Sequence, residues 1–121
     1  MSLTDGGDGH MDKERRRTPR FPFIASAEVM EQSSGSRMNT RISDLSAAGC
    51  YVDTINPLPK GTPVHLKIFT ETQSFEAPAT VVYSHAHLGM GLMFREVQPN
   101  SQSVLENWLP AGMQQRQEPR R

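Results

Sequence analysis

The stretch VHLKIFTETQSFEAPATVVYSHAHLGMGLMF, residues 64–94, decides the fold that we expect for this chain. Its first six residues alternate apolar and polar side chains, which places Val64, Leu66 and Ile68 on one face of a strand. Short polar or glycine-containing connections then divide the stretch, and its three strand-forming parts are residues 64–69, 75–85 and 89–94. Strands joined by such short connections predict an antiparallel sheet.

Shorter strand-forming segments precede this stretch. They are rich in β-branched and aromatic residues and are separated by segments containing glycine or proline, and we expect them to form strands over residues 23–31, 37–42 and 50–53. The segment 43–49 between the last two is expected to be a turn-rich loop. The single cysteine, Cys50, lies in an apolar-leaning strand, so we expect a buried core residue rather than a nucleophile.

A helix is expected after the last strand. Val104, Leu105, Trp108 and Leu109 follow helical spacing, which predicts a helix over residues 101–109 that begins at a Ser cap and packs on the sheet. Six short strands and one terminal helix favour an all-β fold, a six-stranded antiparallel β-barrel with a C-terminal α-helix, over an alternating βαβ fold.

Length and composition fit one domain. The chain has 121 residues, which suits a single modest core. The leader 1–12 and the tail 111–121 lack core-forming residues, so we expect both to be disordered. No apolar run approaches the roughly 20 residues of a membrane-spanning helix, and the N-terminus lacks the pattern of a secretion signal. We therefore expect a cytoplasmic protein without a membrane partner.

A local basic segment stands out against a balanced total charge. Lys+Arg and Asp+Glu each total 13, but five cationic side chains fall between Lys13 and Arg20. Arg16 and Arg20 lie four residues apart on a segment that Pro19 biases toward an extended backbone. Guanidinium groups bind phosphates or guanine edges and stack on bases. Taken alone, such a cluster is more commonly a solvated arm or a nonspecific nucleic-acid contact.

A second polar pattern, DLSAAG, follows the second expected strand. Asp44 offers an acceptor for the N–H groups of a guanine edge, Ser46 a hydroxyl for phosphate or base, and Gly49 a close approach to the backbone. The same residue types are also ordinary turn chemistry, because Asp and Ser side chains commonly bond to nearby backbone amides. Alone, the pattern leaves both interpretations open.

Together, RxxxR ahead of the first strand and DxSxxG after the second resemble the two-part signature of the PilZ domain family. The strand GMGLMF at 89–94 resembles the closing strand of these domains, and the terminal helix has the expected place. The resemblance covers about residues 13–109. It implies a single domain over 13–110 of the split-barrel type, with a flexible arginine arm at 13–22, a barrel at 23–94 and the helix at 101–109.

The resemblance also implies a function, which is binding of the second messenger cyclic di-GMP without catalysis, cofactor or metal. By position, Arg16 and Arg20 would hold guanine edges and phosphates, while Asp44, Ser46 and Gly49 would contact guanine and the adjacent backbone. Arg15 and Arg17 would add phosphate contacts. The resemblance leaves open one ligand molecule or an intercalated dimer per chain, and an arginine just before RxxxR, here Arg15, goes with the dimer.

Such a ligand would order the basic arm over the barrel. The arm has repelling charges and few apolar anchors, so we expect it to be mobile without ligand and to close when ligand binds. A downstream effector protein, which the sequence does not identify, would read the closed surface.

Other functions have less support. An enzyme would need a nucleophile and base in register, and no histidine neighbours a catalytic-looking serine or cysteine motif. His65, His85 and His87 would make an incomplete metal site, since no cysteine or carboxylate completes the set. A barrel that binds single-stranded nucleic acid would need more base-stacking aromatic residues. A protein-interaction adaptor without ligand would be expected to lack the arginine motif. We therefore expect no nucleic-acid partner.

Overall fold

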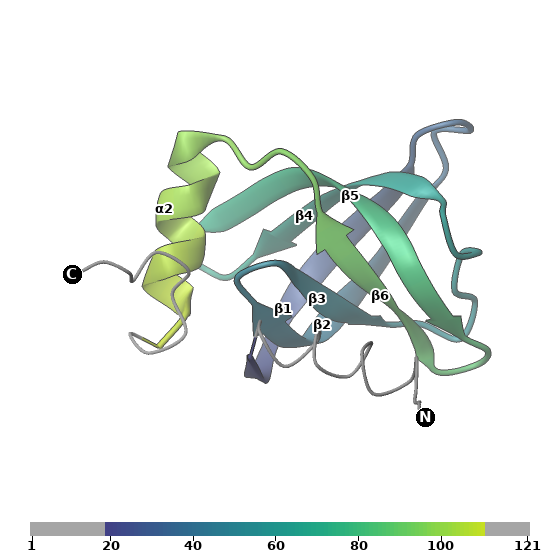
Figure 1. Ribbon diagram of the computed structural model, residues 1–121, viewed down its shortest axis with the longest axis horizontal. Helices are drawn as coiled ribbons and strands as arrows, with labels where there is room; N and C mark the ends of the chain where they lie inside the picture. The colour runs from purple at the N-terminus through teal and green to yellow at the C-terminus, as the bar shows by residue number, and fades with distance from the viewer. Residues whose placement is uncertain (1–18, 111–121) are drawn as a thin grey trace, which may run out of the picture.

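Alternating side chains build a sheet that closes on itself. The computed structural model describes residues 19–110, whose strands are β1 (Arg20–Glu31), β2 (Arg37–Ser46), β3 (Gly49–Asp53), β4 (Pro63–Phe69), β5 (Ser74–His85) and β6 (Gly89–Phe94), followed by helix α2 (Pro99–Trp108). All neighbouring strands are antiparallel, and the order β1-β2-β3-β6-β5-β4 closes because β4 also pairs with β1. The predicted six-stranded antiparallel barrel with a terminal helix is confirmed (Figure 1).

The inward faces of the strands form one apolar core. In β4, Val64, Leu66 and Ile68 are fully buried, as the alternation in the sequence predicted. Phe75 of β5 packs against Phe94 of β6 with ring centroids 4.8 Å apart. Cys50 is also buried in this core. Burial raises the pKa of its thiol far above the ordinary value, so it is a core residue and not an activated thiolate.

Helix α2 covers one end of the barrel, and the β1–β2 hairpin projects at the other (Figure 1). Leu105 and Leu109 are buried in the barrel core. Trp108 packs on Phe23 of β1 with ring centroids 5.2 Å apart, so the predicted contact of this tryptophan with the barrel is confirmed.

The start of α2 differs from the expected Ser cap. The helix begins at Pro99 after Gln98, whose side chain makes no capping hydrogen bond. Proline at this position loses no helical hydrogen bond, because the first N–H groups of a helix have no partner within it. Ser101 is instead a buried residue of the first helical turn. Its hydroxyl accepts a hydrogen bond from the Glu76 backbone N–H of β5 at 3.2 Å. Ser101 therefore fastens the helix to the barrel.

Two strands are longer than expected where the polar motifs lie. Strand β1 begins at Arg20, three residues before the expected start, and β2 continues through Asp44 to Ser46. Both extensions are paired with each other, from Arg20 opposite Ser46 to Pro22 opposite Asp44. Asp44 therefore lies on a strand and not in the expected loop, which shrinks to two residues.

Strands β1, β2 and β5 each carry an irregularity in their pairing. The register shifts between Pro22 and Ala25 in the β1–β2 pairing, between Ile42 and Asp44 in the β2–β3 pairing, and between Val81 and Tyr83 in the β5–β6 pairing. An extra residue in a strand reverses which face the next side chains occupy. The bulges in β2 and β5 thus decide which polar groups of those strands reach the outer surface, whereas side chains of β1 alternate without a break from Arg20 to Val29.

The expected disordered leader and tail, and most of the arginine arm, lie outside the described residues. Within residues 19–110, no helix is long and apolar enough to cross a membrane.

Candidate functional site

Cross-strand pairing places a row of side chains on the outer surface of the barrel. Asp44 of β2 lies opposite Tyr51 of β3, Tyr51 lies opposite Gly91 of β6, and Gly91 lies opposite Tyr83 of β5. Paired residues in a sheet point to the same face. Strict alternation from the buried Ile42 and Val81 would have turned Asp44 and Tyr83 inward, so the bulges bring both of them to the surface.

Arg20, at the start of β1, joins this row. Its Nη2 donates a hydrogen bond to the Tyr83 hydroxyl at 2.6 Å, and its Nη1 lies 3.5 Å from Asp44 Oδ2. The guanidinium also lies 5.7 Å from the centre of the Tyr83 ring. Burial alone would lower the pKa of Arg20, but the hydrogen bond to Tyr83 and the charges of Tyr83 and Asp44 raise it above its ordinary value. Arg20 is therefore a cation that Tyr83 and Asp44 hold in place.

Asp44 has an acceptor to spare. One carboxylate oxygen faces Arg20, while Oδ1 is buried and has no hydrogen-bond partner among the described residues. A buried acceptor without a donor is costly, by about 1–3 kcal/mol. Such a group is suited to a ligand that brings its own N–H donors.

Three aromatic rings line the same hollow as the Arg20–Asp44 pair. Tyr51 and Tyr83 are stacked with centroids 6.1 Å apart, and His85 contacts both rings. The Tyr51 hydroxyl and His85 Nδ1 are 3.1 Å apart in a hydrogen bond. Glycines in β6 make room for the rings, because a Cβ on Gly91 would overlap the Tyr83 ring and one on Gly89 would overlap Tyr51.

These groups border an open hollow of about 720 Å³. Its lining residues are Arg20, Asp44, Tyr51, Lys60, Val82, Tyr83 and His85. Lys60 forms no ion pair with any described carboxylate, so the hollow combines two cationic side chains, one acceptor carboxylate and aromatic faces. Phosphates, planar bases and ring N–H groups are the chemical features that this set can bind.

Ser46 and Gly49 support the turn and do not line the hollow. The buried Ser46 hydroxyl accepts hydrogen bonds from the Ala48 and Gly49 N–H groups at 3.2 and 3.0 Å and lies 3.2 Å from the Gly49 carbonyl oxygen. A Cβ on Gly49 would overlap the Leu92 carbonyl oxygen of β6. Close packing against β6 therefore requires glycine at position 49. Of the two interpretations of DxSxxG, turn chemistry is the one that applies to Ser46 and Gly49.

The structure unites only part of the expected site. Arg20 and Asp44 come together across 24 residues of sequence, whereas Arg15, Arg16 and Arg17 lie outside the described residues. Sequence reasoning missed Tyr51, Lys60, Tyr83 and His85 as neighbours of the site. The spacing of Tyr83 and His85, two residues apart on an expected strand, was the one signal that could have placed them together.

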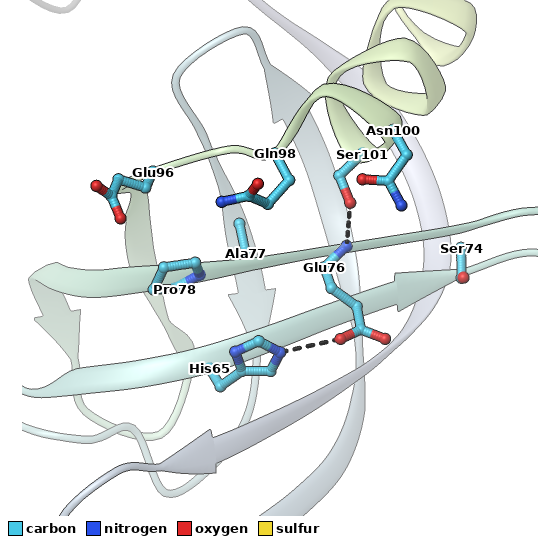
Figure 2. A pocket seen from close by; sticks show the side chains of 9 residues that line it. All are labelled: His65, Ser74, Glu76, Ala77, Pro78, Glu96, Gln98, Asn100 and Ser101. Atoms are coloured by element: carbon cyan, nitrogen blue, oxygen red, sulfur yellow. Dashed lines mark hydrogen bonds and ion pairs between the residues drawn. The ribbon is translucent and has the colours of Figure 1, made fainter.

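A second depression, of about 330 Å³, lies between β5 and the segment that leads into α2 (Figure 2). Here His65 Nε2 pairs with Glu76 Oε1 at 3.1 Å, and Glu96 is another acidic residue of the lining. Figure 2 shows Ser101 of α2 bonded to the Glu76 backbone and Glu96 on the far side of the depression. Two carboxylates would repel a phosphate, so this place suits an anionic ligand less well than the Arg20 hollow.

The histidines that were weighed as metal ligands do not form a cluster. His65 pairs with Glu76, His85 contacts Tyr51, and His87 lies in the β5–β6 turn with a φ of 66°. Residues 19–110 contain no group of three or more His, Cys, Asp or Glu side chains that could hold a metal ion.

A family model described as the PilZ domain matches residues 14–110. None of the curated proteins matches the sequence.

Solved structures share the fold. The inhibitor of motility MotI/DgrA from Bacillus subtilis superimposes with a TM-score of 0.65 at 19% identity, covering 78% of this chain and 49% of that chain. The chain therefore spans about half the length of that protein. The PilZ domain of YcgR from Escherichia coli, solved with c-di-GMP, gives a TM-score of 0.62 at 18% identity over 76% of this chain and 86% of that chain. The PilZ domain of CeSA from a cellulose-synthesizing bacterium gives 0.56 at 18% identity, over 72% and 90%.

Proposed function

The chain belongs to the PilZ domain family, and on that basis we propose that it is a receptor for cyclic di-GMP and not an enzyme. The observation that carries the proposal is the pairing of Arg20 with Asp44 at the edge of the 720 Å³ hollow. These residues belong to RxxxR and DxSxxG, and the bulged β1–β2 pairing brings them together. The related YcgR domain was solved with c-di-GMP, which supports the same class of ligand here.

The chemistry of the hollow suits each part of this ligand. Its two phosphates are anionic, and Arg20 is a cation that lines the hollow. Its guanine edges carry N–H donors, and Asp44 Oδ1 is a buried acceptor without a donor among the described residues. Its purine faces are planar, and the rings of Tyr51 and Tyr83 lie beside the pair. A guanidinium that binds phosphate or stacks on a base is the strongest of these contacts.

The remaining arginines lie close to Arg20 in the sequence. Arg16 precedes Arg20 by four residues, so its Cα is at most about 14 Å from that of Arg20 even when the chain is fully extended. Arg15, Arg16 and Arg17 would therefore close over a ligand that sits on the barrel beside Arg20. Ser46 and Gly49 would act mainly by holding the turn after Asp44.

Isothermal titration of cyclic di-GMP into the purified chain tests the proposal. We expect saturable binding, and we expect Arg20→Ala or Arg16→Ala to weaken it by roughly ten- to a hundredfold, the worth of a hydrogen bond to a charged group. GMP and a short single-stranded oligonucleotide are the controls. The molar ratio distinguishes a single ligand from an intercalated dimer. Absence of heat together with an unchanged melting temperature would contradict the receptor function.

We propose further that the ligand orders the arm and that a protein effector reads the closed form. Hydrogen exchange along residues 13–22 should slow when cyclic di-GMP is added, while exchange in α2 should not change. Equal exchange of the arm with and without bound ligand would rule out this mechanism and leave the binding function intact.

A further inference from the structure

Arg20 makes a closer contact with Tyr83 than with Asp44. The two motifs contain Arg20 and Asp44, but the nearest atoms of these residues are 3.5 Å apart, at the outer limit of a hydrogen bond, and both side chains are partly exposed. The Tyr83 hydroxyl accepts from the same guanidinium at 2.6 Å, with the ring 5.7 Å from its central carbon. Tyr83, which neither motif includes, therefore sets where the guanidinium lies.

Tyr83 is itself held by the barrel. The extra residue before it in β5 turns its side chain outward. Its ring then lies over Gly91 of β6, where any Cβ would overlap three ring atoms. The rings of Tyr51 and His85 flank it, with centroids 6.1 and 5.2 Å away. The Tyr83 side chain is thus held in place by its neighbours, whereas the longer Arg20 side chain has more rotatable bonds.

The hold leaves Arg20 able to bind. A guanidinium carries five N–H donors, of which one contacts Tyr83 and one Asp44, so the others remain for a ligand. Fixing a flexible arginine before binding removes an entropy cost that the ligand would otherwise meet. We propose that Tyr83, seated on Gly91, is a positioning residue that holds Arg20 in its ligand-binding orientation. The proposal rests on the receptor function and adds a residue to it.

A double-mutant cycle tests this role. Tyr83→Phe keeps the ring and removes only the hydroxyl, and we expect the affinity for cyclic di-GMP to fall by on the order of tenfold. In an Arg20→Ala background the same change should have less than about a twofold effect, because the group it positions is gone. An unchanged affinity of Tyr83→Phe would overturn the proposal. An equal loss in both backgrounds would also overturn it, since Tyr83 would then act on the ligand directly.

A second variant keeps the hydroxyl and moves it. Gly91→Ala should displace the Tyr83 ring, because the three atoms nearest to a Cβ there belong to that ring. We expect it to weaken binding about as much as Tyr83→Phe, with the same dependence on Arg20. Ser103→Ala, which removes an exposed hydroxyl from α2, is the control and should leave the affinity unchanged.

A measurement without ligand separates this proposal from the receptor function. Arginine side-chain ¹⁵N NMR of the full chain should show Arg20 Nη groups with hindered rotation, assigned by their loss in Arg20→Lys. These signals should average in Tyr83→Phe. If the parent protein does not bind cyclic di-GMP, the receptor function fails, while the NMR comparison still supports or overturns the hold of Tyr83 on Arg20.

Discussion

At the scale of single residues, Gly49 and Ser46 of the signature stabilise the fold itself. Gly49 lies against the Leu92 carbonyl of β6, and Ser46 satisfies the backbone amides of its turn. Both residues would be needed to present Asp44 even if neither touched the ligand. A motif position can therefore be required for a fold reason and still be essential for binding.

Gly49→Ala should destabilise the barrel by about 2–3 kcal/mol, since its Cβ meets backbone that cannot move without shifting β6. Chemical denaturation without ligand measures this loss. Gly91→Ala is the matched control, because the three atoms nearest to its Cβ belong to the Tyr83 side chain and not to the backbone, and it should cost less. Equal stability of Gly49→Ala and the parent would show that the glycine serves the ligand alone.

Burial of Cys50 predicts a pH effect on stability. Burial raises the pKa of its thiol, so the folded state keeps the proton that the unfolded state loses above about pH 8.5. This contribution is fully present below that pH and is lost as pH rises further, by up to about 1.4 kcal/mol per unit. Unfolding free energies at pH 7.5, 8.5 and 9.5 should therefore fall less steeply for Cys50→Ala than for the parent. Identical slopes would contradict the prediction.

At the scale of elements, bulges convert a regular barrel into a site. Strand β4 follows strict alternation, and so does β1 from Arg20 to Val29, whereas β2 and β5 each have a register shift directly before Asp44 or Tyr83. The site therefore lies on the irregular side of the barrel. Helix α2 lies across one end, where it seals the core.

Leu105→Ala should test whether α2 is part of the folding unit. Leu105 is fully buried, so its truncation should cost about 2–5 kcal/mol and lower the denaturation midpoint of the barrel as a whole. The exposed Ser103 of the same helix provides the control, since Ser103→Ala should change stability by less than about 0.5 kcal/mol. A barrel that kept its full stability after Leu105→Ala would show that the helix is a separate appendage.

At the scale of the whole molecule, charge separates a receptor for a small ligand from a nucleic-acid protein. The chain has 13 basic and 13 acidic residues, and five of the basic ones lie between Lys13 and Arg20, so positive charge is concentrated locally without a net excess over the whole chain. A ligand with two phosphates and no condensed counterions engages few of these charges. The long-range field should therefore contribute little to binding.

Binding of cyclic di-GMP should accordingly weaken by less than about tenfold between 50 and 200 mM salt, where proteins that neutralise six to ten phosphates lose about 10³–10⁵. Titrations at several salt concentrations measure the slope, with a single-stranded oligonucleotide as the comparison. A steep slope for both ligands would indicate a nucleic-acid function instead.

The sequence by itself determined the elements and the family. Alternation in residues 64–69 and helical spacing in 104–109 are local patterns, and both appear in the structure as expected. RxxxR and DxSxxG could also be recognised from the sequence, because each is a short run of neighbouring residues. Only the tertiary structure decided that Arg20, Asp44 and Tyr83 meet, and that Ser46 and Gly49 serve the turn. The physical reason is the bulges: each depends on pairing with a distant strand, and a one-residue shift reverses every side chain after it, so counting along one strand would have buried Asp44 and Tyr83 in the core.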